Sequence, residues 1–327
     1  MSKGVFMSLF IDNLLHPTIL FFILGLVVSL LKSDLDVPDQ ISKFLSIYLL
    51  MSIGLNSGYE LGVIGISISV AKFFVVCILF AVLIPTIGYF TLRYKHNVAD
   101  SSLIAACYGS VSAVTFLAAT SFLIDNEIKF DGYITTALGL MEFPAIIVGL
   151  IFYKLFTHAY INKKQLVKYI IQHTLLDSSI VLLLGSIAIG YISGMDGKEE
   201  MMPFISNIFK GMLALYLLDI GIKAGRHLPQ IVNSSFFLII FAIVVPIING
   251  IIGILVSHFI LHFDIGNSLL VTMLFASASY LVVPSSMSIS IPDANSNTAV
   301  TITLVITFTF NVLLAMPVYY FILEKLQ

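Results

Sequence analysis

Charged residues are scarce in this 327-residue chain, where Asp, Glu, Lys and Arg together make up 10% of the total. Soluble domains carry about 25% charged residues, so this chain has too little polar surface for a water-soluble globule. Its 16 Lys and Arg residues are balanced by 18 Asp and Glu residues. This balance leaves no basic surface for phosphates, which excludes nucleic-acid binding.

Cysteine is also rare, with only Cys77 and Cys107, each within an apolar run. Two such thiols cannot support a disulfide scaffold. The 7 His residues are scattered, whereas a zinc site needs clustered ligands. Hydrophobic residues are abundant, at 59%. The composition therefore predicts an all-α polytopic membrane protein.

Ten apolar stretches have the ~20-residue length that crosses a bilayer. Five of them precede a polar linker and five follow it. The predicted spans are Leu14–Leu31, Ile41–Ser57, Ser67–Leu92, Ser101–Phe122, Tyr133–Phe156, Leu175–Ile192, Phe204–Ile222, Phe236–Ile260, Ser268–Ser288 and Thr298–Leu323. The linker alternates Lys163, Lys164 and Lys168 with apolar residues. This pattern predicts an amphipathic helix on the membrane surface.

The Lys and Arg residues favour one orientation of the chain in the cell inner (plasma) membrane. With the N-terminus outside, the cytoplasmic loops hold nine basic residues, and the opposite face holds four. The nine are Lys32, Lys43, Arg93, Lys95, Lys163, Lys164, Lys168, Lys223 and Arg226. The positive-inside rule then predicts both termini outside and the linker in the cytoplasm.

Short segments of the two halves match in the same order. The matched pairs are Phe80–Pro85 with Phe241–Pro246 (offset 161), Ile53–Gly58 with Ile220–Gly225 (offset 167), and Leu24–Gly25 with Leu184–Gly185 (offset 160). Five spans is an odd number, so the second copy enters the membrane from the opposite side. The sequence predicts two inverted five-helix repeats, an architecture of many secondary transporters.

Helix-breaking stretches occur at matching places in the fourth and ninth spans, at 109–115 and 276–286. Pro284 disfavours continued helix in the second stretch. A half-helix N-terminus favours a small anion, and unwound carbonyls can coordinate a cation such as sodium. The predicted substrate-binding residues are Gly109, Ser110, Ser112, Ala113, Thr115, Ala276, Ser277 and Ser279. Helix packing is the competing interpretation of these small residues.

Ionisable residues inside spans are costly and often functional. Glu142 lies deep in the fifth span, and Asn311 lies in the corresponding region of the tenth. Their oxygens predict a sodium site, unless Glu142 is protonated or bonded to a neighbouring helix. Asp219 and Lys223 are four residues apart, which favours a structural pair on one helix face.

Several of these segments together resemble the sodium-dependent bicarbonate transporters of cyanobacteria and other bacteria. They are Ile53–Gly58, Gly109–Thr115, Met141–Ala145, Ser277–Pro284 and Ile291–Asn295. The resemblance implies bicarbonate bound between the broken helices, sodium beside it, elevator-type alternating access and a homotrimer. The family's carboxylate before Pro falls on Glu142. The chain departs from the family at Tyr280, where Asp is usual, and at Val283–Ser285, where Gly-Pro-Pro is usual.

The resemblance also implies a division into scaffold and mobile core. The scaffold comprises residues 1–58 and 175–225, and the core comprises residues 59–156 and 226–327. Residues 157–174 form the linker, where a soluble cytoplasmic regulator would bind, although the linker is short.

The sequence thus predicts a secondary transporter for sodium-coupled uptake of bicarbonate or a similar small anion. One alternative is a sodium symporter of another organic anion, of the bile-acid type. A membrane scaffold or sensor would not need matched helix breaks. An intramembrane enzyme would need a base beside a nucleophile, and no His lies near Ser110, Ser277 or Glu142 in the sequence.

Overall fold

The computed structural model describes residues 7, 10, 11, 13–65, 67–157, 178–288 and 290–326. The described residues form helices and connecting segments, with no strand among them. The helices are α2 (Pro17–Leu30), α3 (Asp39–Ile64), α4 (Ile68–Leu92), α5 (Val98–Gly109), α6 (Ala113–Asp125), η1 (Gly132–Thr135), α7 (Thr136–Thr157), α9 (Ser178–Met202), η3 (Pro203–Asn207), α10 (Phe209–His227), η4 (Leu228–Asn233), α11 (Phe236–Leu255), η5 (Val256–Leu261), α12 (Ile265–Ala276), α13 (Val282–Ser288), α14 (Ser296–Val300), η6 (Thr301–Phe308), η7 (Asn311–Ala315) and α15 (Met316–Leu326). The predicted amphipathic linker helix falls, apart from Thr157, outside these residues.

Seven helical segments of the described chain are long and apolar enough to cross a membrane. They are Asp39–Ile64, Ile68–Leu92, Val98–Asp125, Gly132–Thr157, Ser178–Asn207, Phe236–Leu261 and Ser296–Leu326. The shorter apolar helices α2 and α12 fall on the first and ninth predicted spans. Helix α10, on the seventh, carries four charged side chains in 19 residues. A polytopic all-helical membrane protein is therefore confirmed, and the count of ten spans stays a prediction.

Helices α2 and α10 cross closely at two glycines and run parallel. A Cβ on Gly25 would lie 2.2 Å from the Leu218 carbonyl oxygen, and one on Gly221 would lie 2.2 Å from the Phe22 carbonyl oxygen. One turn further on, Gly225 meets Ser29. Only glycine permits this approach, as in other membrane helix pairs with small residues at four-residue spacing.

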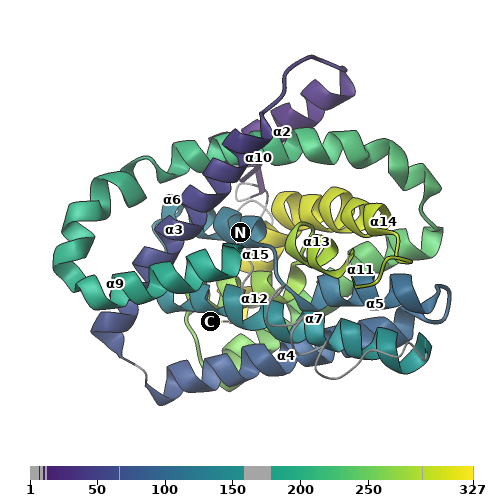
Figure 1. Ribbon diagram of the computed structural model, residues 1–327. Coiled ribbons are helices and arrows are strands. Elements are labelled where there is room, and N and C mark those ends of the chain that lie inside the picture. The colour runs from purple at the N-terminus through teal and green to yellow at the C-terminus, as the bar shows by residue number, and fades with distance from the viewer. Residues whose placement is uncertain are drawn as a thin grey trace.

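Helices α3 and α9 form a second pair of the same kind. Gly54 meets Ser186, and one turn later Gly58 meets Gly190, with the Gly58 Cβ position 2.1 Å from the Ile187 carbonyl oxygen. Because both contacts advance in the same direction, these helices are also parallel. Two membrane-spanning helices can be parallel only when an odd number of spans lies between them in the sequence. Figure 1 places α2, α3, α9 and α10 along one side of the molecule and α4, α5, α7 and α11 on the other.

The seventh predicted span begins five residues later than expected, at Phe209 instead of Phe204. Gly194 has φ 61° and ψ −153°, which bends α9 between two helical parts. Pro203 then opens the π-helical turn η3 that precedes α10. The positive φ at Gly194 requires a residue without a Cβ. The bend at this glycine separates the sixth predicted span from the seventh.

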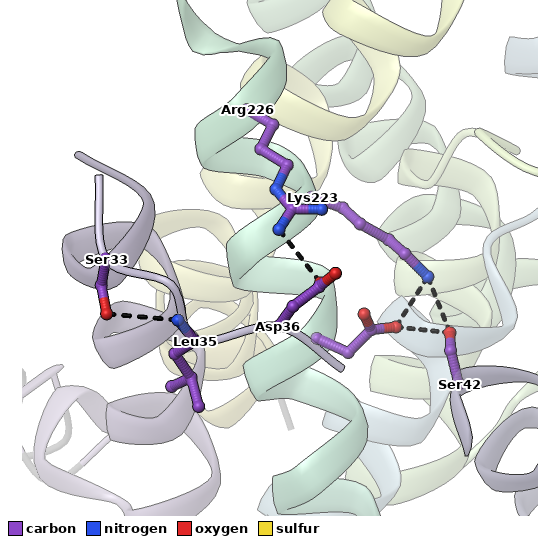
Figure 2. Close-up of polar contacts among 7 residues, drawn as sticks. Ser33, Leu35, Asp36, Ser42, Lys223 and Arg226 are labelled. Atoms are coloured by element: carbon purple, nitrogen blue, oxygen red, sulfur yellow. Dashed lines mark hydrogen bonds and ion pairs between the residues drawn. The ribbon is translucent and has the colours of Figure 1, made fainter. Parts of the chain in front are cut away.

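Asp219 and Lys223 form the structural pair that their spacing predicts. Lys223 Nζ lies 2.8 Å from Asp219 Oδ2 and donates a 2.7 Å hydrogen bond to Ser42 Oγ. Ser42 Oγ donates in turn to Asp219 Oδ2 at 2.5 Å. This triangle, with the exposed Arg226–Asp36 pair beside it, joins α10 to α3 and its preceding loop (Figure 2). Lys223 thereby neutralises the buried Asp219 carboxylate where α10 packs on α3.

The most deeply buried helices are α5, α6 and α12, in which nearly every residue is inaccessible. Helix α4 packs on α5 and α7, and α11 packs on α12. The outer helices therefore shield these three short helices, which belong to the fourth and ninth predicted spans, from lipid. Irregular backbone at membrane depth can exist only in such shielded places.

Candidate functional site: two crossing helix breaks

The fourth predicted span is interrupted at Ser110–Ser112. Helix α5 ends at Gly109, and both Ser110 (φ −89°, ψ 177°) and Ser112 (φ −98°, ψ 113°) are extended. Helix α6 then begins at Ala113, and Ser112 Oγ accepts a 3.2 Å hydrogen bond from the Thr115 amide. The Ser112 side chain is therefore an N-cap, the position that serine favours. The predicted break is present.

The ninth predicted span is also interrupted, between Ala276 and Val282. Ser279 Oγ accepts a 3.3 Å hydrogen bond from the Val283 amide in the first turn of α13. Pro284 lies within α13 rather than in the break. A proline in the first turn of a helix loses no hydrogen bond, and its ring disfavours helix in the residues before it. The expectation that Pro284 disfavours a continuous ninth span therefore agrees with the break that precedes α13.

The two breaks cross and bond to each other. The Ser279 amide donates to the Cys107 carbonyl oxygen at 2.8 Å. The Ser112 amide donates to Ser277 Oγ at 3.0 Å, and that hydroxyl donates to the Leu274 carbonyl oxygen at 3.0 Å. A carbonyl near the end of α5 thus gains a partner from the opposite break, and one near the end of α12 is bonded by Ser277 of its own break, which itself accepts from the opposite one. These bonds satisfy part of the backbone that each interruption frees.

A cavity of about 110 Å³ lies beside this crossing. Its lining residues are Ser46, Leu50, Val111, Ser112, Ala113, Val114, Leu138, Glu142, Ser179, Ile180, Leu183, Tyr216, Ser279, Tyr280, Leu281 and Val282. The first N–H groups of a helix have no partner within it, and Ala113 and Val114 open α6 at the cavity wall. The cavity therefore combines a helix N-terminus, four serines and a carboxylate.

Three of the eight predicted substrate-binding residues line the cavity: Ser112, Ala113 and Ser279. Two others have structural contacts, because Gly109 packs on the Pro85 ring and the Ala276 carbonyl accepts a bond from Asn311. The remaining three lie inside the crossing. Ser277 joins the two breaks, Ser110 is buried in the break of the fourth span, and Thr115 is buried in the first turn of α6.

Besides the Tyr280 hydroxyl, three side-chain oxygens near the crossing are buried without a hydrogen-bond partner among the described residues. They are Ser110 Oγ, Thr115 Oγ1 and Asn311 Oδ1. Buried polar atoms are normally bonded, so unpartnered oxygens in a membrane interior indicate a place for a cation or water.

Glu142 and Asn311, the predicted sodium ligands, occupy different surroundings. Glu142 on α7 lines the cavity. Asn311 is not among the lining residues; its Nδ2 donates a 2.7 Å bond to the Ala276 carbonyl oxygen at the end of α12. Their joint role stays a prediction.

The sequence-based prediction of the site missed four polar residues of the cavity: Ser46 on α3, Ser179 on α9, Tyr216 on α10 and Tyr280 in the second break. The first three carry no motif and approach the breaks only through packing of the two glycine-crossed helix pairs. Tyr280 was recognisable as the residue that replaces the family's Asp, but its position in the wall was not.

A polytopic membrane protein with a small polar cavity between two interrupted helices has the features of a secondary transporter. The chain belongs to the Na+-dependent bicarbonate transporter superfamily, whose family model matches residues 17–324. It is therefore a sodium-dependent transporter and not an enzyme. A comparison with curated protein sequences gives no match.

Proposed function

We propose that the chain takes up bicarbonate together with sodium, and that bicarbonate binds in the cavity beside the two crossing breaks. The carrying observation is the position of Ser112, Ser279 and the α6 N-terminus around one small cavity. Hydroxyl and amide donors there match the negative oxygens of bicarbonate, and the partial positive charge of the helix end favours an anion.

The cavity volume supports a small substrate. Sites for drug-sized ligands measure roughly 300–1,000 Å³, whereas this cavity has about 110 Å³. A bile-acid-sized anion would not fit without a large rearrangement. The volume therefore favours bicarbonate over the larger organic anions of the alternative symporter.

Sodium would bind through oxygen atoms, the ligands that hard cations prefer. The unpartnered Ser110, Thr115 and Asn311 oxygens supply neutral ligands near the crossing. Glu142 supplies the charge from the cavity wall. A cation and an anion bound close together nearly cancel, which lowers the cost of burying either one.

Two inverted repeats account for the paired contacts. Gly54 and Gly58 correspond at offset 167 to Gly221 and Gly225, and each set crosses a parallel helix through a small residue. The partners are Ser186 and Gly190 in one pair and Gly25 and Ser29 in the other, at offset 161. Gly185, the sequence match of Gly25, has nothing within 4 Å of its Cβ position, so Ser186 is the better equivalent.

The crossing supports the same symmetry. The Ser279 amide bonds the Cys107 carbonyl, and the equivalent Ser112 amide reaches the equivalent Leu274 carbonyl through Ser277 Oγ. All of these pairs are related by offset 167. In a chain of ten spans in two inverted repeats, an odd number of spans separates α2 from α10 and α3 from α9, as these two parallel pairs require.

An elevator-type movement is the form of alternating access that we propose. The scaffold would be the glycine-crossed pairs α2–α10 and α3–α9, and the core would be the helices around the breaks. The cavity supports this division, since Ser46, Ser179 and Tyr216 of the first group face Ser112 and Ser279 of the second across it.

The remaining proposals rest on the sequence and on family membership. They are the homotrimer, the soluble cytoplasmic regulator, the plasma-membrane location and the orientation with both termini outside.

Uptake into proteoliposomes tests this function. Purified protein should accumulate labelled bicarbonate when sodium is higher outside, and should give background uptake when potassium or choline replaces sodium. A chain that carries bicarbonate equally well without sodium, or prefers a bulky organic anion, would contradict the proposal.

A further inference from the structure

An apolar groove lies between α4 and α11, on the membrane-facing side of the protein and apart from the ion cavity. It has a volume of about 490 Å³. Its lining residues are Phe80, Leu83, Ile84, Ile87, Gly88, Thr91, Phe237, Ile240, Phe241, Val244, Val245, Ile248, Asn249 and Ile252. Several of these are exposed, including Ile87 at 65% and Ile248 at 50%. Since both helices are apolar enough to span the bilayer, the groove opens to lipid.

The length of the groove corresponds to one leaflet. From Phe80 to Thr91 the helix rises about 16 Å, at about 1.5 Å per residue. The hydrocarbon core of a bilayer is about 30 Å thick, so one acyl chain of one leaflet would extend along the groove.

Basic residues lie at one end of this groove. Arg93 and Lys95 follow the last turn of α4 and are exposed. The same loop is joined to the start of α11, because His96 Nε2 lies 3.2 Å from Ser235 Oγ and its ring lies 6.0 Å from the Phe237 ring. Among the ion pairs of the described chain, none includes Arg93 or Lys95. Arg93 donates to the His96 carbonyl oxygen and Lys95 Nζ lies over the Tyr94 ring. Neither partner carries a negative charge, so both positive charges stay unneutralised at the depth of the lipid headgroups.

We propose that this groove binds an anionic phospholipid, with its acyl chain along α4 and α11 and its phosphate beside Arg93 and Lys95. Apolar grooves that end in basic residues suit such lipids, because anionic headgroups are attracted by about 1 kcal/mol per Lys or Arg near the surface. Two such residues convert to a preference of about tenfold to thirtyfold over a neutral headgroup.

Lipid titration of the purified protein tests this site. Phosphatidylglycerol and phosphatidylcholine with identical acyl chains would be added separately, and unfolding temperature and lipid retention in native mass spectra would be measured. The wild type should retain phosphatidylglycerol about tenfold or more in preference and unfold at a temperature several degrees higher with it. The double variant Arg93→Gln, Lys95→Gln should lose the preference.

A second variant separates the groove from simple surface charge. Val244→Trp would fill the groove from a position that is 42% exposed, and retention of both lipids should fall. Val82→Trp, on α4 outside the lining residues and 38% exposed, is the matched control and should leave retention unchanged. Equal retention of both lipids by the wild type, or a preference that survives both changes, would overturn the proposal. A loss of oligomer in Val244→Trp without loss of lipid would make the groove an interface between copies and would overturn it equally.

Discussion

Replacing Ser279 with Leu is expected to reduce sodium-driven bicarbonate uptake to background. The larger side chain would occupy a cavity of about 110 Å³ and remove the hydroxyl that accepts from the Val283 amide. Overpacking of this kind costs about 1–3 kcal/mol of stability, so a folded but inactive protein is expected. Uptake in proteoliposomes, beside size-exclusion and thermal unfolding profiles, measures both effects.

Ser285→Leu is the matched control for this change. Ser285 lies in α13, the short helix that follows Ser279, but is exposed, and its hydroxyl bonds only to the Leu281 and Val282 carbonyls one turn before it. Its uptake should stay near wild type. Ser279→Ala keeps the cavity open and removes only the hydroxyl, so partial loss of uptake is expected. Full uptake by Ser279→Leu in a well-folded sample would place the substrate elsewhere.

Glu142→Gln is expected to raise the sodium concentration for half-maximal uptake by about tenfold or more. The substitution keeps the size of a buried side chain at the cavity wall and removes its negative charge. A loss of about 1.4 kcal/mol of cation binding corresponds to tenfold. The sodium activation curve at saturating bicarbonate measures this effect directly.

Glu127→Gln provides the comparison, because Glu127 is exposed beyond the end of α6 and should not change the curve. If Glu142→Gln transports with an unaltered sodium curve, the charge at residue 142 does not serve the cation. The unpartnered oxygens of Ser110, Thr115 and Asn311 would then have to bind sodium without it.

The helix breaks could be predicted from sequence because their cause is local. Small and hydroxyl-bearing residues at membrane depth mark both interruptions, and Ser112 acts as an N-cap in the way that its residue type favours. In the second break, Pro284 lies in the first turn of α13, a position that proline tolerates and through which α12 could not continue. A proline in a membrane span therefore indicates a nearby boundary but not the side of it.

The scaffold side of the cavity could not be predicted, since its cause is tertiary. Ser46 and Tyr216 reach the cavity only because α3 and α10 are held by glycine contacts with α9 and α2. Gly54 and Gly221 were recognised as a repeated motif, but a motif does not identify its partner helix. That information resides in the packing, where a Cβ on Gly221 would lie 2.2 Å from a backbone oxygen.

The central claim is that one small anion binds where the two broken helices cross. An experimental density map of the protein, prepared with sodium bicarbonate and again with sodium chloride, tests it most directly. The expected result is planar density between the Ser112 and Ser279 hydroxyls in the first preparation alone. Unbroken helix through residues 110–112 and 277–281, or bicarbonate density at another place, would contradict it.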